Sequence, residues 1–196
     1  MIRDFGLHGG LVLVLVAAAF VLPEYHHGNV ARIMVLAAFA MGYNIAFGYT
    51  GLLSLGHAMF FGAGVYAAGL GVQFAGWGGT EALLAGPLAG GLLACLVGLL
   101  ALRTTGVSLM IVTLMFAQAA FLLTSYFGEY TRADEGFVLP RTARHVGALD
   151  LSDPGIRYAA ALILFSTAIL LCLVRVRSRL GRVRSALLED ETRAQM

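Results

Sequence analysis

The feature that most constrains this chain is its succession of long apolar runs joined by short polar turns. Six runs can be drawn, over residues 9–22, 30–47, 58–75, 82–102, 107–127 and 156–174. Because about 20 apolar residues, rising about 1.5 Å each along a helix, cross the hydrocarbon core of a bilayer, such runs indicate membrane-spanning helices. The sequence therefore predicts an all-α polytopic transmembrane helix bundle of about six spanning helices, forming a single transmembrane domain over residues 1–196.

The composition supports a membrane protein and excludes an ordinary soluble domain. Of the 196 residues, 59% are hydrophobic and only 12% are charged, whereas soluble domains carry about 25% charged residues. All 13 basic residues are arginine, so the lysine of a phosphate-binding P-loop is missing. Any energy from ATP hydrolysis must therefore come from another subunit.

The arginines predict how the chain is oriented in the membrane. Five of them crowd behind the last apolar run, at Arg175, Arg177, Arg179, Arg182 and Arg184. A basic cluster beside a spanning helix marks the cytoplasmic side. This explanation is simpler than a lipid-binding or nucleic-acid-binding patch, so no nucleic-acid partner is expected. Alternation then places both termini and the tail 175–196 in the cytoplasm and the loop 128–155 outside, and Arg32, near a predicted outer end, disagrees with the rule.

The outer loop 128–155 is the one sizeable hydrophilic segment of the sequence, and it carries charges of both signs. It suits a docking surface or a small ordered cap, since loops held by a rigid scaffold commonly carry recognition. A solvated connector is the alternative interpretation.

Polar side chains gather where the second apolar run gives way to the third. They are Asn44, Tyr49, Thr50, Ser54 and His57. Polar groups in lipid are costly unless they are paired or face water, so these residues are candidates for lining a translocation path. Hydrogen bonding between helices explains each of them equally well. The fifth run holds weaker candidates of the same kind, namely Thr113, Gln118 and Thr124.

The glycines in and after the stretch GYTGLLSLGH, residues 48–57, admit two structural interpretations. A discontinuous helix is tolerated in membranes only where its freed backbone is buried in protein or lines a wet cavity, and transporters use such breaks to bind substrate. A short inner turn is the alternative. Elsewhere, small residues four apart, such as Gly64 with Ala68 and Gly86 with Gly90, predict helices that approach closely.

Enzymatic chemistry is not expected from these residues. Ser54 and His57 could meet on one helical face, but the serine has no nucleophile elbow and no carboxylate is placed to orient the histidine. The adjacent His26 and His27 point apart and lack a third metal ligand. We therefore assign no catalytic residue, no metal site and no cofactor.

Three stretches resemble one known family. GYNIAFGYTGLLSLGHAMFFGAGVYAAG, residues 42–69, closely resembles the N-terminal signature of the permease subunits of branched-chain amino acid ABC importers, the leucine-isoleucine-valine transport family. DEGFVLPR, residues 134–141, is similar to the outer loop of that family. SRLGRVRSALLEDETRAQM, residues 178–196, is similar to its cytoplasmic coupling segment.

The resemblance implies a multi-pass subunit of the bacterial inner membrane that transports amino acids and is not itself an enzyme. It implies several partners: two ABC ATPase subunits inside, a related permease that completes a heterodimer, and a periplasmic substrate-binding protein outside. It also implies that the tail contacts the ATPase, with coupling candidates at Gly181, Arg182, Glu189, Asp190, Glu191 and Arg193. A short charged segment behind an arginine-rich helix end suits such docking, and a frayed tail is the alternative.

Other functions are open from the sequence alone. The same architecture could carry urea or a short amide, whereas an intramembrane hydrolase is disfavoured because Ser54 lacks catalytic partners. Members of the family continue past the coupling segment with further spanning helices, whereas this chain stops at Met196, so we expect the permease to be incomplete at its C-terminus. A truncated, non-transporting membrane scaffold is therefore a further alternative.

Overall fold

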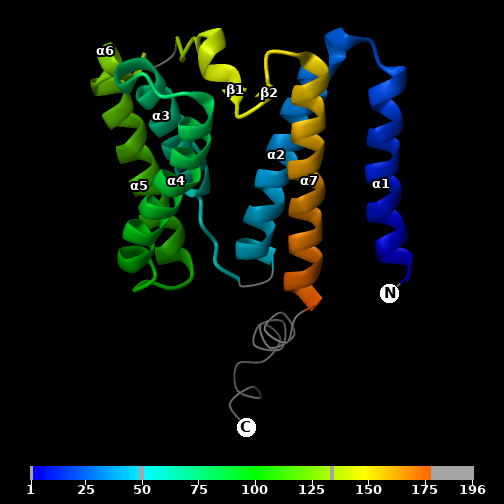
Figure 1. Cartoon of the computed structure of the whole chain (residues 1–196). Coiled ribbons are helices and arrows are strands. Elements are labelled where there is room, and N and C mark those ends of the chain that lie inside the picture. Colours follow the sequence, from blue (N-terminus) through cyan, green and yellow to red (C-terminus); the bar gives the residue numbers. More distant parts are fainter. Residues whose placement is uncertain (1, 49–50, 133–134, 178–196) are drawn as a thin grey trace. The chain divides into compact units, whose positions relative to one another are not determined.

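The computed structural model describes residues 2–48, 51–132 and 135–177 (Figure 1). Its long helices are α1 (Ile2–Val21), α2 (Glu24–Gly48), α3 (His57–Ala75), α4 (Gly79–Ala101), α5 (Val107–Tyr126) and α7 (Pro154–Arg177). The chain divides into two compact units. Unit 1 takes in Met1–Gly51 and Leu151–Met196, and unit 2 takes in Leu52–Asp150.

Five of these helices, α2 to α5 and α7, are long and apolar enough to cross a membrane, and α1 contributes a shorter apolar helix, Gly6–Val21. The prediction of an all-α polytopic bundle is confirmed, and the first of the predicted spans is this shorter helix. Some helices extend beyond the apolar runs, since α2 begins at Glu24 rather than at Val30. Helical hydrogen bonding continues into polar residues, and an acidic residue in the first turn suits the positive end of a helix.

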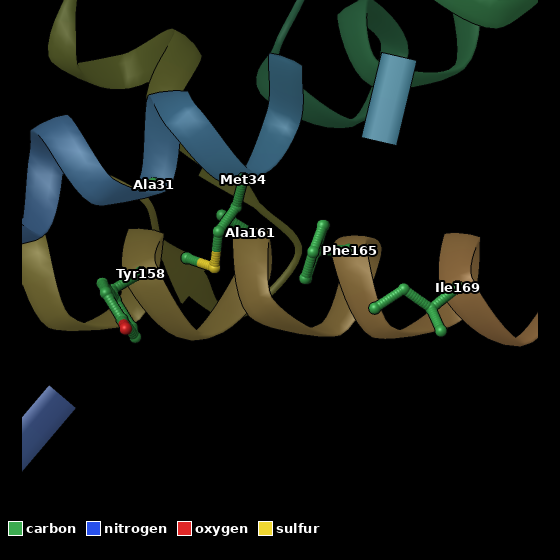
Figure 2. Packing of buried hydrophobic residues seen from close by; sticks show 6 residues of the cluster. All are labelled: Ala31, Met34, Tyr158, Ala161, Phe165 and Ile169. Atoms are coloured by element: carbon green, nitrogen blue, oxygen red, sulfur yellow. The ribbon is translucent and has the colours of Figure 1, made fainter. Parts of the chain in front are cut away.

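In unit 1, the helices α2 and α7 run in the same direction and pack against each other (Figure 2). Their shared core comprises Ala31 and Met34 from α2 with Tyr158, Ala161, Phe165 and Ile169 from α7. These positions recur every three or four residues, so each set lies on one helix face. The helix α1 is tied to α7 by the Tyr158 hydroxyl, which donates a hydrogen bond of 2.6 Å to the Leu15 carbonyl oxygen.

In unit 2, the helices α3 and α4 form an antiparallel hairpin with a short linker. Gly76 ends α3 with a φ of 67°, in the left-handed region that glycine enters without strain. At the start of α4, the Glu81 carboxylate accepts a hydrogen bond from the Gly78 N–H. The hairpin therefore reverses sharply at one end, which places α3 and α4 side by side along their lengths.

Glycines let the backbones of α3 and α4 approach closely. A Cβ at Gly64 would lie 2.8 Å from the Gly86 carbonyl oxygen, and a Cβ at Gly90 would lie 2.8 Å from the Phe60 carbonyl oxygen. A larger residue at either position would push the two helices apart. Because lipid supplies no hydrophobic drive for helix association, such close contact stabilises the pair. The predicted tight packing at these glycines is confirmed.

The helix α5 packs with α3 and α4 around a second apolar cluster. Val97 and Ala101 of α4 and Leu109 of α5 are buried there. Met59, in the first turns of α3, and Phe116 of α5 pack against them. The start of α3 is therefore held between two neighbouring helices.

The segment that joins α5 to α7 folds over the ends of α3 and α4 as a small cap. It contains α6 (Gly128–Thr131), the 3-10 helix η1 (Arg141–Arg144), and the antiparallel strands β1 (His145–Val146) and β2 (Leu149–Asp150). The Gly147 N–H donates to Thr80 Oγ1 at 3.2 Å, and the Phe137 ring lies edge-on to Tyr66 with 5.7 Å between centroids. The segment is a folded cap rather than an extended connector, and its extracytoplasmic position stays a prediction.

Candidate functional site

The candidate site is a break in helical structure ahead of α3. Helix α2 ends at Gly48 and α3 begins at His57, and the described residues between them, 51–56, are not helical. Gly51 adopts a φ of 65°, a conformation that glycine tolerates and larger residues rarely adopt. The chain therefore reaches α3 through irregular backbone.

Two contacts show how deep this backbone lies within unit 2. The Leu55 N–H donates to Thr113 Oγ1, and Thr113 stands about 9 Å inside α5 at the helical rise per residue. Phe60, in the first turn of α3, faces Gly90, about 16 Å before the end of α4. The helix α3 therefore begins partway along its neighbours, and residues 52–56 lead up to it as non-helical chain (Figure 1).

Thr113 is the anchor of this segment. Its side chain is buried, and its hydroxyl lies 2.9 Å from the Leu109 carbonyl oxygen and 3.0 Å from that of Met110, both within its own helix. The same oxygen accepts the hydrogen bond from the Leu55 N–H at 3.1 Å. Unpaired backbone donors are costly at membrane depth, so the threonine stabilises a conformation that leaves Leu55 outside any helix.

Gly56, the last residue of the break, can lie directly against α5 because it has no side chain. It is buried, and a Cβ there would collide with the Thr113 carbonyl oxygen. Its own carbonyl oxygen accepts a hydrogen bond of 3.0 Å from the Met59 N–H, which begins the first turn of α3. Gly56 therefore lets the backbone of the break rest directly on the backbone of α5.

Two of the predicted path residues flank this contact. Ser54 is half-buried within the break, and His57 is the first residue of α3. The His57 ring is half-buried and lies edge-on to Phe60, with 5.6 Å between ring centroids. Because the first N–H groups of a helix have no partner within it, they offer partial positive charge at this point. The break thus combines a hydroxyl, an imidazole and a helix N-terminus.

The other predicted path residues are placed differently. Asn44 is exposed on α2 in unit 1, and its side chain lies over the end of its own helix, because a Cβ at Gly48 would be 2.6 Å from Asn44 Oδ1. Tyr49 and Thr50 lie outside the described residues, as does the whole predicted coupling segment, residues 178–196. The structure therefore brings Ser54 and His57 into one unit, and the roles of all the path candidates stay predictions.

The weaker candidates in the fifth run separate into three kinds. Thr113 anchors the break, whereas Thr124 Oγ1 donates only to the Phe121 carbonyl oxygen of its own helix. Gln118 is exposed on α5. A threonine within an apolar run was a visible signal in the sequence, but its partner, 58 residues away at Leu55, was not.

These features define the class of the protein. Among the residues that the structure describes, five apolar helices are long enough to cross a bilayer, and a non-helical segment between two of them packs on a third through the buried Gly56, so the chain is a multi-pass membrane protein. A family model described as branched-chain amino acid transport system / permease component matches residues 28–196. The chain belongs to this family, as the resemblance of its GYTGLLSLGH stretch predicted. It is therefore a permease component of a transport system. No curated protein and no solved structure matches the chain.

Proposed function

We propose that this permease is one subunit of an ATP-driven importer in the bacterial inner membrane, and that residues 51–57 line its path for branched-chain amino acids. The observation that carries the proposal is the non-helical backbone beside Thr113, about 9 Å inside α5. Backbone of this kind occurs at membrane depth only where it is buried in protein or borders a water-filled cavity. Membership of the permease family supports the cargo class.

The chemistry of the break suits a zwitterionic amino acid. The N–H groups at the start of α3 favour the substrate carboxylate, and the Ser54 hydroxyl can donate to that carboxylate or accept from the ammonium group. Leu52 and Leu53, in the same segment, supply apolar surface for a branched side chain. No bond is made or broken in the substrate, so the residues act by binding and release alone.

Alternating access requires the break to move relative to the helices that hold it. Gly51 is suited to absorb a change in backbone angles, because it already adopts a φ that only glycine accepts readily. At the other end of the segment, the hydrogen bond between Leu55 and Thr113 fixes residues 55 and 56 on α5. Closure of an ATPase pair would drive a rigid-body movement that opens and closes the path around this hinge.

The proposed partners follow from the family and from the charge pattern of the chain. The permease would pair with a related permease, receive substrate from a periplasmic binding protein, and dock ATPase subunits in the cytoplasm. The arginine-rich end of α7 supports a cytoplasmic tail. The coupling role proposed for Gly181, Arg182, Glu189, Asp190, Glu191 and Arg193 rests on the sequence of that tail.

Reconstitution into liposomes tests this function. The full chain is combined with the ATPase subunits, the related permease and the binding protein, with ATP on the side of the ATPases, and uptake of labelled leucine is followed. We expect leucine uptake that stops when ATP or the binding protein is omitted. A parallel assay with labelled urea tests the alternative cargo. An assembled complex that takes up neither compound contradicts the proposal and favours a non-transporting scaffold.

A further inference from the structure

A groove between α2 and α7 in unit 1 carries two arginines that the transport proposal does not use. Its volume is about 550 Å³. The residues that give the groove its character are Asn29, Arg32 and Val35 on α2 and Arg157, Ala160 and Leu164 on α7. The groove is therefore cationic at one end and apolar at the other.

The Arg157 guanidinium lies against the face of α2 that carries Arg32. A Cβ at Gly28 would lie 3.4 Å from Arg157 Nη2, so Arg157 reaches across from α7 and packs over Gly28. Arg32 is four residues further along α2, on the same face and one turn away. The missing side chain at Gly28 thus makes room for a second positive charge beside Arg32.

Because α2 and α7 are parallel, the polar residues of both helices lie at one end of the groove and the apolar residues lie at the other. Because α2 and α7 run in the same direction, Arg157 lies about 5 Å and Leu164 about 15 Å from the start of α7. Val35 likewise follows Arg32 along α2. For helices that span the bilayer, this order directs the arginines toward the interfacial layer and the apolar walls toward the hydrocarbon core. The positive N-terminus of α7 adds to the charge near Arg157, which lies in the first turn of that helix.

Neither arginine has a carboxylate partner among the residues that the structure describes. Asp153, which is close to Arg157 in sequence, directs its Oδ1 to the N–H groups of Gly155 and Ile156 at 2.7 and 3.2 Å, and so caps α7. Two like charges in one groove repel each other, and an anion between them would remove that repulsion. Arginine is well matched to phosphate, because its planar donors bind two oxygens at once.

We propose that this groove binds an anionic phospholipid, with the phosphate between Arg32 and Arg157 and an acyl chain along Val35 and Leu164. The arginines at one end of the groove match the charged headgroup of a phospholipid, and the apolar residues at the other end match its acyl chain. Asn29 supplies a further amide donor to the headgroup. A bound lipid explains why Arg32 disagrees with the charge rule that orients the other arginines, since a lipid phosphate neutralises it.

Lipid retention by the full chain tests the proposal. The protein is purified in detergent, supplied with phosphatidylglycerol or with phosphatidylcholine, and examined by native mass spectrometry. We expect phosphatidylglycerol to bind about fivefold more weakly to Arg32→Gln and to Arg157→Gln, and its binding to be lost in the double variant. Arg103→Gln, which removes an exposed arginine of unit 2, should bind as the unmodified chain does. Ala160→Phe keeps both charges but fills the groove, so we expect it to lose the lipid as well. This variant still tests the proposal if the double variant fails to fold.

Three results would overturn the proposal. Unchanged phosphatidylglycerol binding in the double variant and in Ala160→Phe places the lipid elsewhere. Full displacement of the lipid by millimolar inorganic phosphate shows a small-anion site in place of a lipid site. If the double variant still binds the lipid but no longer binds the substrate-binding protein, the arginines bind a carboxylate of that protein instead of a lipid.

Discussion

Single side chains hold the break ahead of α3 in place, and Thr113 is the one with the clearest energetic role. Its hydroxyl serves the carbonyl groups of its own helix and the N–H of Leu55 at once. Replacing Thr113 with valine keeps the volume of the side chain and removes that acceptor. We expect the free energy of unfolding in detergent to fall by about 1–3 kcal/mol, because the Leu55 N–H loses its hydrogen-bond partner.

Thr124→Val is the matched control, because that hydroxyl bonds only within α5. We expect it to change the free energy of unfolding by less than about 0.5 kcal/mol. A Thr113→Ser variant keeps the acceptor and should recover most of the loss. Equal effects of the two valine substitutions would contradict the anchoring role of Thr113.

At this scale the sequence predicted which residues are polar but not what they contact. Thr113 stands out as a hydroxyl within an apolar run, and Ser54 and His57 as polar groups between two such runs. The bond from Leu55 to Thr113 joins residues 58 apart, and its donor is a backbone group that every leucine has. Such a pairing depends on how helices pack, so no pattern in the sequence identifies it.

Among the elements, the contact between α3 and α4 depends on glycine. Gly90 and Gly91 are neighbours on α4, but a Cβ at Gly90 would meet the Phe60 carbonyl oxygen at 2.8 Å, whereas one at Gly91 meets nothing within 4 Å. We expect Gly90→Ala to destabilise the protein by about 1–3 kcal/mol through forced separation of the helices. Gly91→Ala should be neutral or stabilising by up to about 1 kcal/mol, because alanine favours a helix.

Thermal unfolding followed by circular dichroism compares these two variants directly. The pair shares helix, residue type and substitution, so the comparison isolates the contact with α3. If both variants have the same midpoint, the close approach of α3 and α4 at Gly90 is not what stabilises the hairpin.

Hydropathy predicts which segments are helices, but it does not predict how far along its neighbours each helix begins. The sequence predicts that the third apolar run begins at Ala58, and the helix begins at His57, a difference of one residue. That α3 starts partway along α4 follows only from contacts such as Phe60 with Gly90. A run of apolar residues shows that a helix is present, but the depth at which the helix lies is set by its neighbours.

For the whole molecule, the proposed function requires the tail to contact the ATPase. We expect reversal of Glu189, Asp190 and Glu191 to lysine to weaken co-purification of the ATPase with the permease, because complementary charge at the contact would become repulsion. Reversal of Glu129, in the predicted outer loop, is the control and should leave co-purification unchanged. Unchanged co-purification of the tail variant would remove the reason for placing the contact there.

Family and membrane class were predictable for the whole chain because they rest on long patterns, the apolar runs and the stretch GYTGLLSLGH, and the family match bears this out. The groove between α2 and α7 was not predictable. Arg32 was visible as an exception to the charge rule, but Arg157 joins it only because the two helices are parallel and Gly28 leaves space.

The central claim is that the break lines the translocation path, and the solvent accessibility of Ser54 tests it most directly. Cys95 and Cys172 are replaced by alanine, Ser54 by cysteine, and the complete transporter is treated with a charged thiol reagent, which reacts only with thiols that water reaches. A cysteine at Leu114, an exposed apolar residue of α5, serves as the control. We predict labelling at position 54 whose rate changes several-fold between ATP-bound and nucleotide-free states, with little labelling at 114. No labelling at position 54 in either state, in a complex that still transports leucine, would contradict the account.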